Sequence, residues 1–238
     1  MNAVILSAGR GSRLLPLTDE MPKCLVTVGS RAILDHQLHA LAQAGAEKAV
    51  VVGGYRHDRI ADHLEAAPPP LPTELRFNPF WAVSSSIGSV WAVRDLLGGR
   101  FCLMNGDTIL EPQILSHALS ARPASLGLLA ERIERPQTDD MLVQERNGSV
   151  RAVAKHLDPA LATHRSLGVI VAAEASGYRA ALDAVIGRPR GIEAYHHDVV
   201  AHLAHTGRVE LIAEESGAWA EIDRPEDIAD WCERRTPD

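Results

Sequence analysis

Three cations and two glycines lie close together near the start of the chain, directly after a short apolar run. Gly9 and Gly11 permit a positive φ, and their missing side chains let a ligand approach the backbone. Successive exposed N–H groups in such a turn form a concave anion-binding surface. Arg10, Arg13 and Lys23 place three positive charges within one loop. These residue types therefore predict a site for a ligand with several negative charges, such as a triphosphate.

Other glycine-rich phosphate loops fit the sequence less well. The spacing over residues 9–13 differs from the G-x-G-x-x-G of a dinucleotide-binding turn, and the G-x-x-x-x-G-K-[ST] of a P-loop is missing. No acidic ribose-binding residue stands about 20 residues after a proper fingerprint, which disfavours a dinucleotide-dependent oxidoreductase. From spacing alone, a tight turn with solvated arginines remains an alternative.

Carboxylates occur at two further places, each next to an apolar strand. Asp107 follows a buried run, and ligands of open α/β sheets bind beyond the carboxyl ends of the strands. Glu221 and Asp223 alternate with apolar neighbours, so they face the same side of a strand. The alternatives are an Asx-turn or helix cap at Asp107 and a cap of the last helix at Asp223.

The string Ala8-Gly9-x-Gly11-x-Arg13-x-x-Pro16-Leu17-Thr18-x-x-x-Pro22-Lys23-x-Leu25-x-x-Val28 resembles the signature of nucleotidyltransferases that make NDP-sugars and CDP-alcohols. The resemblance covers nearly the whole chain and is strongest in residues 3–28, 104–107 and 219–227. It implies that Arg13, Lys23 and Asp107 act in catalysis and that Asp107 and Asp223 hold Mg²⁺. A few hard oxygen ligands, with phosphates and water completing an octahedron, are what Mg²⁺ requires.

The resemblance also implies which residues bind the nucleotide. The expected set is Leu6, Ala8, Gly9, Arg10, Gly11, Ser12, Arg13, Lys23, Ser85, Ser86, Ser89, Asn105 and Gly106. Residues 78–91 lack the Leu-Gly-Thr-Ala-Gly element that is typical of sugar-1-phosphate enzymes of this family. They are similar instead to the segment in bacterial CTP:phosphocholine cytidylyltransferases that lies near the base and ribose. A polar helix N-cap at Ser85 or Ser86 is the alternative.

The acceptor-binding residues implied by the resemblance are Lys155, Tyr195 and Glu221. Lys155 matches a lysine that approaches the acceptor phosphate, and Tyr195 lies in a segment that resembles one with a choline-contacting tyrosine. Tyrosine and glutamate together suit an ammonium group, by cation–π and Coulomb attraction. However, Met141 or Asp140 stands about where phosphocholine enzymes tend to have an aromatic residue. A primary amine, as in phosphoethanolamine or 2-aminoethylphosphonate, is therefore a rival.

The order of apolar and periodic segments predicts an α/β fold, with a mostly parallel Rossmann-like sheet, flanking helices and a β-rich acceptor lid. We expect strands at 2–6, 48–52, 73–77 and 100–104, and helices at 31–44, 57–66 and 89–97. Strands are then expected at 124–131, 141–145, 149–155, 167–173, 209–213 and 219–222, with helices at 176–186, 193–205 and from 225. One domain, 1–238, is expected, with a nucleotide-binding half (1–123) and an acceptor-binding half (124–238).

Composition narrows the class of partner. The net charge of −7 disfavours binding to nucleic acid or to anionic membranes. Three scattered cysteines argue against a disulfide framework or structural zinc, and no leader or long apolar stretch is evident, so we expect a cytoplasmic protein. The histidines at 196, 197, 202 and 205 are expected to be surface or lid residues rather than metal ligands. The sequence leaves a homodimer open.

The predicted activity is a Mg²⁺-dependent cytidylyltransferase. It would join CMP from CTP to a small phosphorylated alcohol, amine or phosphonate and release pyrophosphate. The acceptor phosphate is already ionised near neutral pH, so no general base is needed. The rivals are a sugar-1-phosphate nucleotidyltransferase that uses UTP or dTTP, and a non-catalytic nucleotide-binding regulatory subunit.

Overall fold

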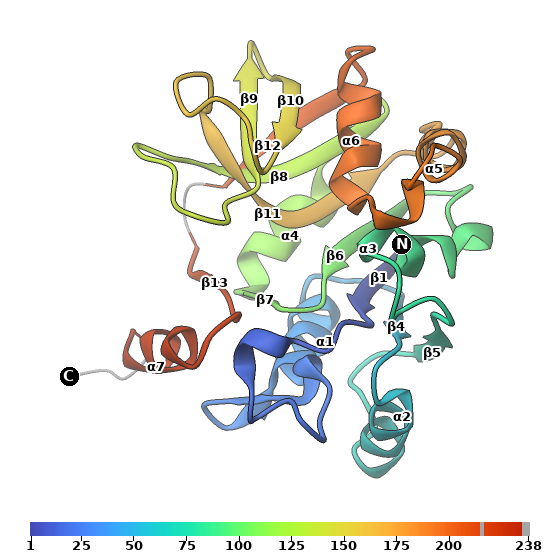
Figure 1. Ribbon diagram of the computed structural model, residues 1–238, viewed down its shortest axis with the longest axis vertical. Helices are drawn as coiled ribbons and strands as arrows, with labels where there is room; N and C mark the ends of the chain where they lie inside the picture. Colours follow the sequence, from blue (N-terminus) through green and yellow to red (C-terminus); the bar gives the residue numbers. More distant parts are fainter. Residues whose placement is uncertain (215–216, 235–238) are drawn as a thin grey trace.

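A nine-stranded sheet forms the centre of the computed structural model, which describes residues 1–214 and 217–234 (Figure 1). The strand order across the sheet is β5-β4-β1-β6-β11-β8-β12-β10-β9. In chain order these strands are β1 (Asn2–Ser7), β4 (Lys48–Gly53), β5 (Thr73–Phe77), β6 (Phe101–Asn105), β8 (Leu126–Arg132), β9 (Leu142–Arg146), β10 (Ser149–Ala154), β11 (His164–Ala172) and β12 (Val209–Glu214).

Pairing in the sheet is parallel in the first half of the chain and mainly antiparallel in the second. β1 pairs in parallel with β4 and β6, and β4 pairs in parallel with β5. β11 joins β6 in the antiparallel direction, and only β8 and β12 restore parallel pairing beyond it. The α/β class is thus confirmed, and the strands predicted between residues 124 and 213 as part of a lid extend the same sheet.

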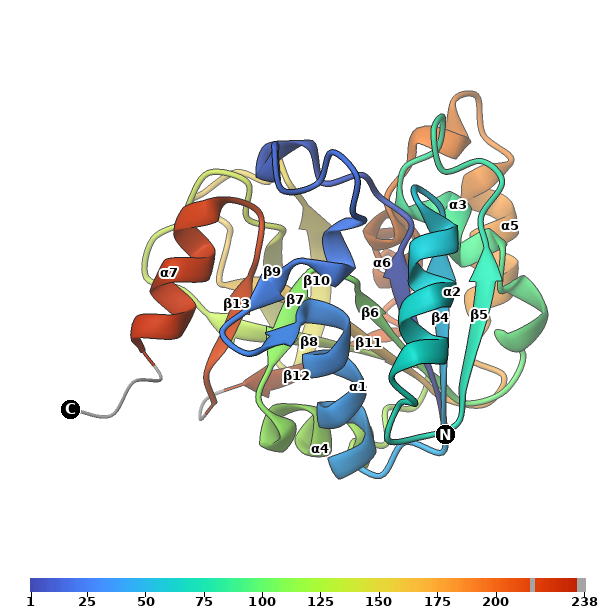
Figure 2. The ribbon, with the colours of Figure 1, turned by 90° about the horizontal axis from the view of Figure 1, so that it is seen from below.

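Helices cover both faces of the sheet. α1 (Ile33–Gln43), α2 (His57–Ala66) and α4 (Pro112–Ser120) pack on one core, and α3 (Ser86–Trp91), α5 (Tyr178–Ile186) and α6 (His196–Ala204) pack on the other. β1 shows why two cores form, because its side chains alternate: Ala3 and Ile5 enter the first core and Val4 the second. Figure 2 shows α1 and α4 side by side. No helix in the described part of the chain is long and apolar enough to span a bilayer.

Two predicted helices differ in their bounds. The helix expected from residue 31 begins at Ile33, because β3 (Arg31–Ala32) first pairs with β2 (Thr27–Val28). The helix expected at 89–97 begins earlier, at Ser86, and ends at Trp91; a 3-10 turn, Arg94–Leu96, follows it. The earlier start matters because it puts Ser86 in the first turn of α3, facing the second half of the chain.

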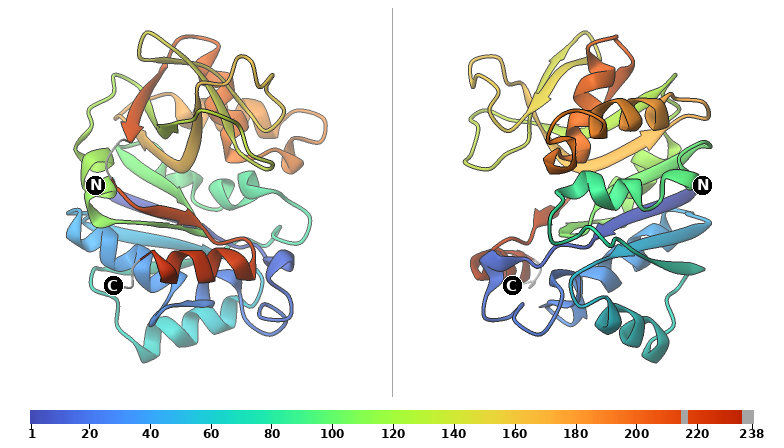
Figure 3. Two further views of the ribbon diagram at one scale, coloured as in Figure 1. Left: turned by 90° about the vertical axis from the view of Figure 1, so that its left-hand side faces the viewer. Right: turned by 45° about the vertical axis from the view of Figure 1, so that its right-hand side comes forward.

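The last helix returns to the first loop of the chain. β13 (Trp219–Glu221) pairs with β7 (Thr108–Leu110), with Glu221 opposite Thr108. α7 (Pro225–Glu233) then packs beside β2, as Figure 3 shows in red against blue. A third core joins these segments; it consists of Leu14, Val26, Val28, Ile33, Ile109, Ile222 and Trp231. This core fixes the loop after β1 relative to the segment that carries residues 221–223.

Candidate active site

A cleft of about 870 Å³ opens where β1 and β6 end. In the parallel register Leu6 lies opposite Asn105, so the loops that follow the two strands emerge side by side. Fourteen of the expected site residues line the cleft: Leu6, Ala8, Gly9, Arg13, Ser85, Ser86, Ser89, Asn105, Gly106, Asp107, Lys155, Tyr195, Glu221 and Asp223. Arg10, Gly11, Ser12 and Lys23 are not among the lining residues.

The loop after β1 is held by Gly11 and Thr18. Gly11 has φ 72°, and a Cβ there would lie 2.7 Å from Cβ of Lys23, so only glycine fits. The buried Thr18 hydroxyl donates a hydrogen bond of 2.8 Å to the Gly11 carbonyl. A Cβ on Gly9 would meet nothing within 4 Å. The backbone at Gly9 therefore stays open to a ligand in the cleft. The missing side chain of Gly11 leaves the space that the Lys23 side chain occupies.

Lys23 joins two carboxylates that come from distant parts of the chain. Its ammonium donates a hydrogen bond of 2.8 Å to Asp107 and a second to Asp223. Burial alone would lower the pKa of Lys23, but the two carboxylates outweigh it and the pKa is raised. Burial would raise the pKa of Asp223, yet Lys23 and Arg13 lower it. Both groups are therefore held in their charged forms.

Arg13 forms a second bridge across the cleft. Its guanidinium lies 2.8 Å from Asp223 and 3.4 Å from Asp139, which is in the loop between β8 and β9. Arg10 instead pairs with Asp19 at 3.1 Å and lies over the ring of Tyr55, outside the cleft. Arg10 is thus directed away from the position that the resemblance implies, whereas Arg13 and Lys23 point toward the carboxylates.

Three carboxylates form a cluster suited to a hard divalent cation. Oxygen atoms of Asp107, Glu221 and Asp223 lie within 4.8 Å of one another. Glu221 faces the open cleft, yet restricted hydration there, together with Asp107 and Asp223, raises its pKa to about 8. Three oxygen ligands with space for phosphate oxygens and water are what Mg²⁺ needs, so the residues present fit this ion.

Asp223 does not cap the last helix, which was the alternative for this residue. Arg224 occupies the N-cap position, and Asp227 at N3 completes a capping box, since its carboxylate accepts the backbone N–H groups of Asp223 at 2.8 Å and Arg224 at 2.6 Å. The carboxylate of Asp223 is directed to Lys23 and Arg13 instead. The helix N-terminus therefore orients Asp223 through its backbone and leaves its side chain to the cluster.

The serines after β5 sit between the two halves of the chain. Ser85 occupies the N-cap position of α3, but its side chain makes no capping hydrogen bond. Ser86 Oγ accepts the backbone N–H of His196 at 2.9 Å, and buried Ser89 accepts from the Asn78 amide at 3.2 Å. The side-chain cap proposed as the alternative is absent at Ser85, and Ser86 links α3 to α6.

Four residues on the acceptor side form two cation–ring pairs. Lys155 Nζ lies 5.4 Å from the ring centroid of Tyr195, and the Arg165 guanidinium lies 4.7 Å from that of Trp219. Arg165 and Trp219 were not among the residues expected at the site. Arg165 was outside the strand expected at 167–173, because β11 begins three residues earlier, at His164. An Arg at a strand start carries no pattern that would have identified it.

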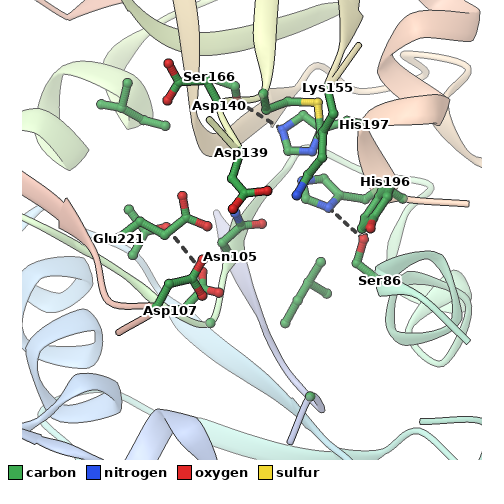
Figure 4. Close-up of a pocket in the computed structure, with 18 of the residues that line it drawn as sticks. Ser86, Asn105, Asp107, Asp139, Asp140, Lys155, Ser166, His196, His197 and Glu221 are labelled. Carbon is green, nitrogen blue, oxygen red and sulfur yellow. Dashed lines mark hydrogen bonds between the residues drawn. The ribbon is translucent and has the colours of Figure 1, made fainter. Parts of the chain in front are cut away.

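The expectation that the histidines of α6 are surface or lid residues is wrong for His196 and His197. Their side chains are buried, and their rings are in contact at a tilt of 42°, with centroids 4.0 Å apart. His196 Nδ1 lies 3.1 Å from Ser86 Oγ, and His197 Nε2 lies 3.0 Å from Ser166 Oγ (Figure 4). Burial lowers the pKa of both, to about 4 for His196. They are therefore neutral groups that form one wall of the cleft.

The two buried, neutral histidines predict that the folded protein loses stability in mild acid. An unfolded histidine has a pKa near 6.5, so the unfolded chain binds more protons than the folded chain between pH 6.5 and 4. We expect the free energy of unfolding to fall by about 2 kcal/mol between pH 7.5 and 5 through His196 alone. Denaturant unfolding at both pH values measures this. His196→Gln should reduce the loss, whereas His205→Gln, at an exposed position, should not; equal pH dependence in both would contradict the assignment.

Comparison with known proteins identifies the relatives of this chain. Residues 2–117 match the family model for nucleotidyl transferase. The chain is 48% identical over 64 residues to CTP:phosphoglutamine cytidylyltransferase of Campylobacter jejuni. This aligned stretch covers 27% of this chain and 25% of that protein. The chain is 29% identical over 235 residues to CMP-5'-(3-aminopropyl)phosphonate synthase of Streptomyces rubellomurinus. This alignment covers 95% of this chain and 37% of that protein.

Relatives that act on sugar phosphates also match. A UTP–glucose-1-phosphate uridylyltransferase of Haloferax volcanii is 35% identical over 114 residues, covering 48% of this chain and 46% of that protein. The chain thus spans less than half the length of these three relatives. Among solved structures, the CTP:phosphocholine cytidylyltransferase of Streptococcus pneumoniae superposes with a TM-score of 0.79 at 20% identity, covering 99% of both chains. That likeness establishes the fold.

Proposed function

Residues 2–117 belong to the nucleotidyl transferase family, and on this premise we propose that the protein transfers CMP from CTP to a small phosphorylated or phosphonate acceptor and releases pyrophosphate. The observation that carries the proposal is the bridge from Lys23 to Asp107 and Asp223. It joins a cation of the anion-binding loop to carboxylates suited to a divalent ion. A triphosphate and its counter-ion require this combination at one point.

The carboxylate cluster would hold Mg²⁺ through Asp107 and Asp223, with Glu221 within reach. When bound, Mg²⁺ would neutralise charge on the phosphates and on the departing pyrophosphate. Lys23 and Arg13 contribute cationic hydrogen-bond donors from the protein at the same point. Because the acceptor phosphate is already ionised near neutral pH, the protein has to position two anions and offset their repulsion, and it needs no general base.

Lys155 is suited to hold the acceptor. It lines the cleft beside the two imidazoles, across from Glu221 and Asp107 (Figure 4). Within residues 1–214 and 217–234, Lys155 forms no ion pair with a carboxylate, unlike Lys23 and Arg13. An ammonium without a carboxylate partner attracts a phosphate or phosphonate, and its position opposite the cluster would direct that group toward the nucleotide.

The preference for CTP is supported by residues 78–91. This segment supplies Ser84, Ser85, Ser86 and Ser89 to the cleft and no glycine-rich turn. The names of two relatives that match this chain also describe CMP or CTP chemistry. The alternative, a sugar-1-phosphate enzyme that uses UTP or dTTP, is favoured by the uridylyltransferase relative.

A grid of reactions decides between these functions. Pyrophosphate release should be measured for four NTPs against phosphocholine, phosphoethanolamine, 2-aminoethylphosphonate and several sugar 1-phosphates, with Mg²⁺ present. We expect CTP with an amine-bearing acceptor to give the highest kcat/KM. A preference for UTP or dTTP with a hexose 1-phosphate would establish the alternative. Binding of CTP without turnover of any pair would favour a regulatory nucleotide-binding protein.

A further inference from the structure

The aromatic rings on the acceptor side of the cleft are already covered by cations of the protein. Lys155 lies over Tyr195 and Arg165 over Trp219, both within the range of a cation–π contact. In the described part of the chain, these are the phenol and indole rings of the acceptor half that line the cleft, since Trp81 belongs to the nucleotide half and packs on Tyr55.

The Arg165 pair is fixed on several sides. The guanidinium of Arg165 is 2.5 Å from Glu131, and Trp219 Nε1 donates to the same carboxylate at 2.8 Å. Trp219 also packs against the core beneath α1 and α4. Arg165 reaches Asp140 as well, though only at 3.4 Å. Arg165 therefore already occupies the indole ring of Trp219. A cation of the substrate could bind this ring only if the network of Arg165, Glu131 and Trp219 were broken.

A quaternary ammonium needs those ring faces. It has no N–H groups, so an aromatic face is the main compensation for its desolvation. In this cleft it would meet Lys155 and Arg165 instead and would be repelled. A primary ammonium has three donors and can use carboxylate oxygens. Asp140 has an oxygen that is only loosely paired, 3.4 Å from Arg165, while its other oxygen accepts the backbone N–H of Gln137 at 2.7 Å.

We propose that the acceptor carries a primary amine, recognised by Asp140, and that Lys155 and Arg165 exclude quaternary ammonium groups by covering Tyr195 and Trp219. The proposal rests on the proposed function, since it describes the acceptor of that reaction. It also assigns Arg165 a role in specificity that is separate from the transfer itself. Arg165 lines the cleft on the acceptor side, beside Glu131 and Trp219.

The test is a methylation series with CTP and Mg²⁺. Phosphoethanolamine, its N-methyl and N,N-dimethyl forms, and phosphocholine are compared by kcat/KM from pyrophosphate release. We expect kcat/KM to fall with each methyl group and to be at least about 10-fold lower for phosphocholine than for phosphoethanolamine. Asp140→Asn should reduce kcat/KM for phosphoethanolamine and leave the KM for CTP unchanged.

Arg165→Met tests the covering of the ring. Freed of its cation, Trp219 should accept the trimethylammonium, so the preference for phosphoethanolamine over phosphocholine should fall by about 10-fold. Arg94→Met is the matched control, because Arg94 lies 5.1 Å from the ring centroid of Trp91 and pairs with Asp183, but does not line the cleft. It should retain the wild-type preference. Arg165→Lys, which keeps a cation near the ring, should retain most of it.

The outcomes separate this proposal from the one it rests on. A CTP-dependent enzyme whose kcat/KM rises with methylation would overturn the amine proposal and leave the proposed function standing. The same holds if Arg165→Met and Arg94→Met change the preference equally. Turnover confined to sugar 1-phosphates would overturn both. The wild-type series decides the matter even if Arg165→Met fails to fold.

Discussion

Replacing Lys23 by alanine is expected to lower kcat for pyrophosphate release by about 10³-fold or more. The ammonium of Lys23 reaches both Asp107 and Asp223, so its loss removes a phosphate-binding cation and leaves two carboxylates facing each other. Their mutual repulsion would also move the two carboxylates out of the positions that a divalent ion requires. Initial rates at saturating CTP and acceptor measure the effect, and circular dichroism at the same protein concentration tests whether the fold is kept.

Lys48→Ala provides the control for this variant. Lys48 also pairs with a carboxylate, that of Glu74, but it lies where β4 begins, at the end of the sheet away from the cleft. It should retain the wild-type rate. A Lys23→Ala protein that is folded and active at a rate close to that of Lys48→Ala would contradict the role given to Lys23.

Replacing Asp107 by alanine is expected to have an effect of similar size, for a different reason. The cluster of Asp107, Glu221 and Asp223 would lose one of its three carboxylates, and Lys23 would lose its 2.8 Å partner. We expect kcat to fall by about 10³-fold at the Mg²⁺ concentration that saturates the wild type. Removal of Mg²⁺ by a chelator should abolish the wild-type activity, and added Mg²⁺ should restore it.

The Mg²⁺ dependence distinguishes a metal ligand from a structural residue. Asp107→Asn, which keeps one oxygen, should need a higher Mg²⁺ concentration for half-maximal activity than the wild type. Asp183→Ala removes a carboxylate paired with Arg94 outside the cleft and should leave both the rate and the Mg²⁺ dependence unchanged. Unchanged Mg²⁺ dependence in Asp107→Asn would exclude this residue as a ligand.

Most of the elements could be predicted because hydrophobic periodicity is a local signal. β1, β4 and β5 lie where their apolar runs do, and Asn147-Gly148 marks the turn between β9 and β10. The start of α1 was misplaced because Arg31 and Ala32 pair with the strand before them. The pairing of neighbouring strands therefore determined where the helix begins.

The candidate site could be anticipated only where a motif marks it. Gly11, Lys23 and Asp107 belong to short strings with fixed spacing, and the structure brings the latter two together. Arg165 and His196 belong to no such string. Their positions depend on the register of β11 and on the contact of α6 with Ser86, which arise from packing of segments far apart in sequence. No local pattern encodes those contacts.

Because the last helix packs against the first loop, the two sides of the site are synthesised far apart in time. Lys23 and Asp223 are separated by 200 residues, yet they share a hydrogen bond. During synthesis Lys23 of the anion-binding loop leaves the ribosome 200 residues before its partner Asp223, and Ile222 and Trp231 of the third core emerge close to that carboxylate. A nascent chain can therefore build much of its central sheet while still unable to assemble the counter-charges of the loop. The ion pairs of Lys23 and Arg13 with Asp223 can therefore form only after residue 223 has been synthesised.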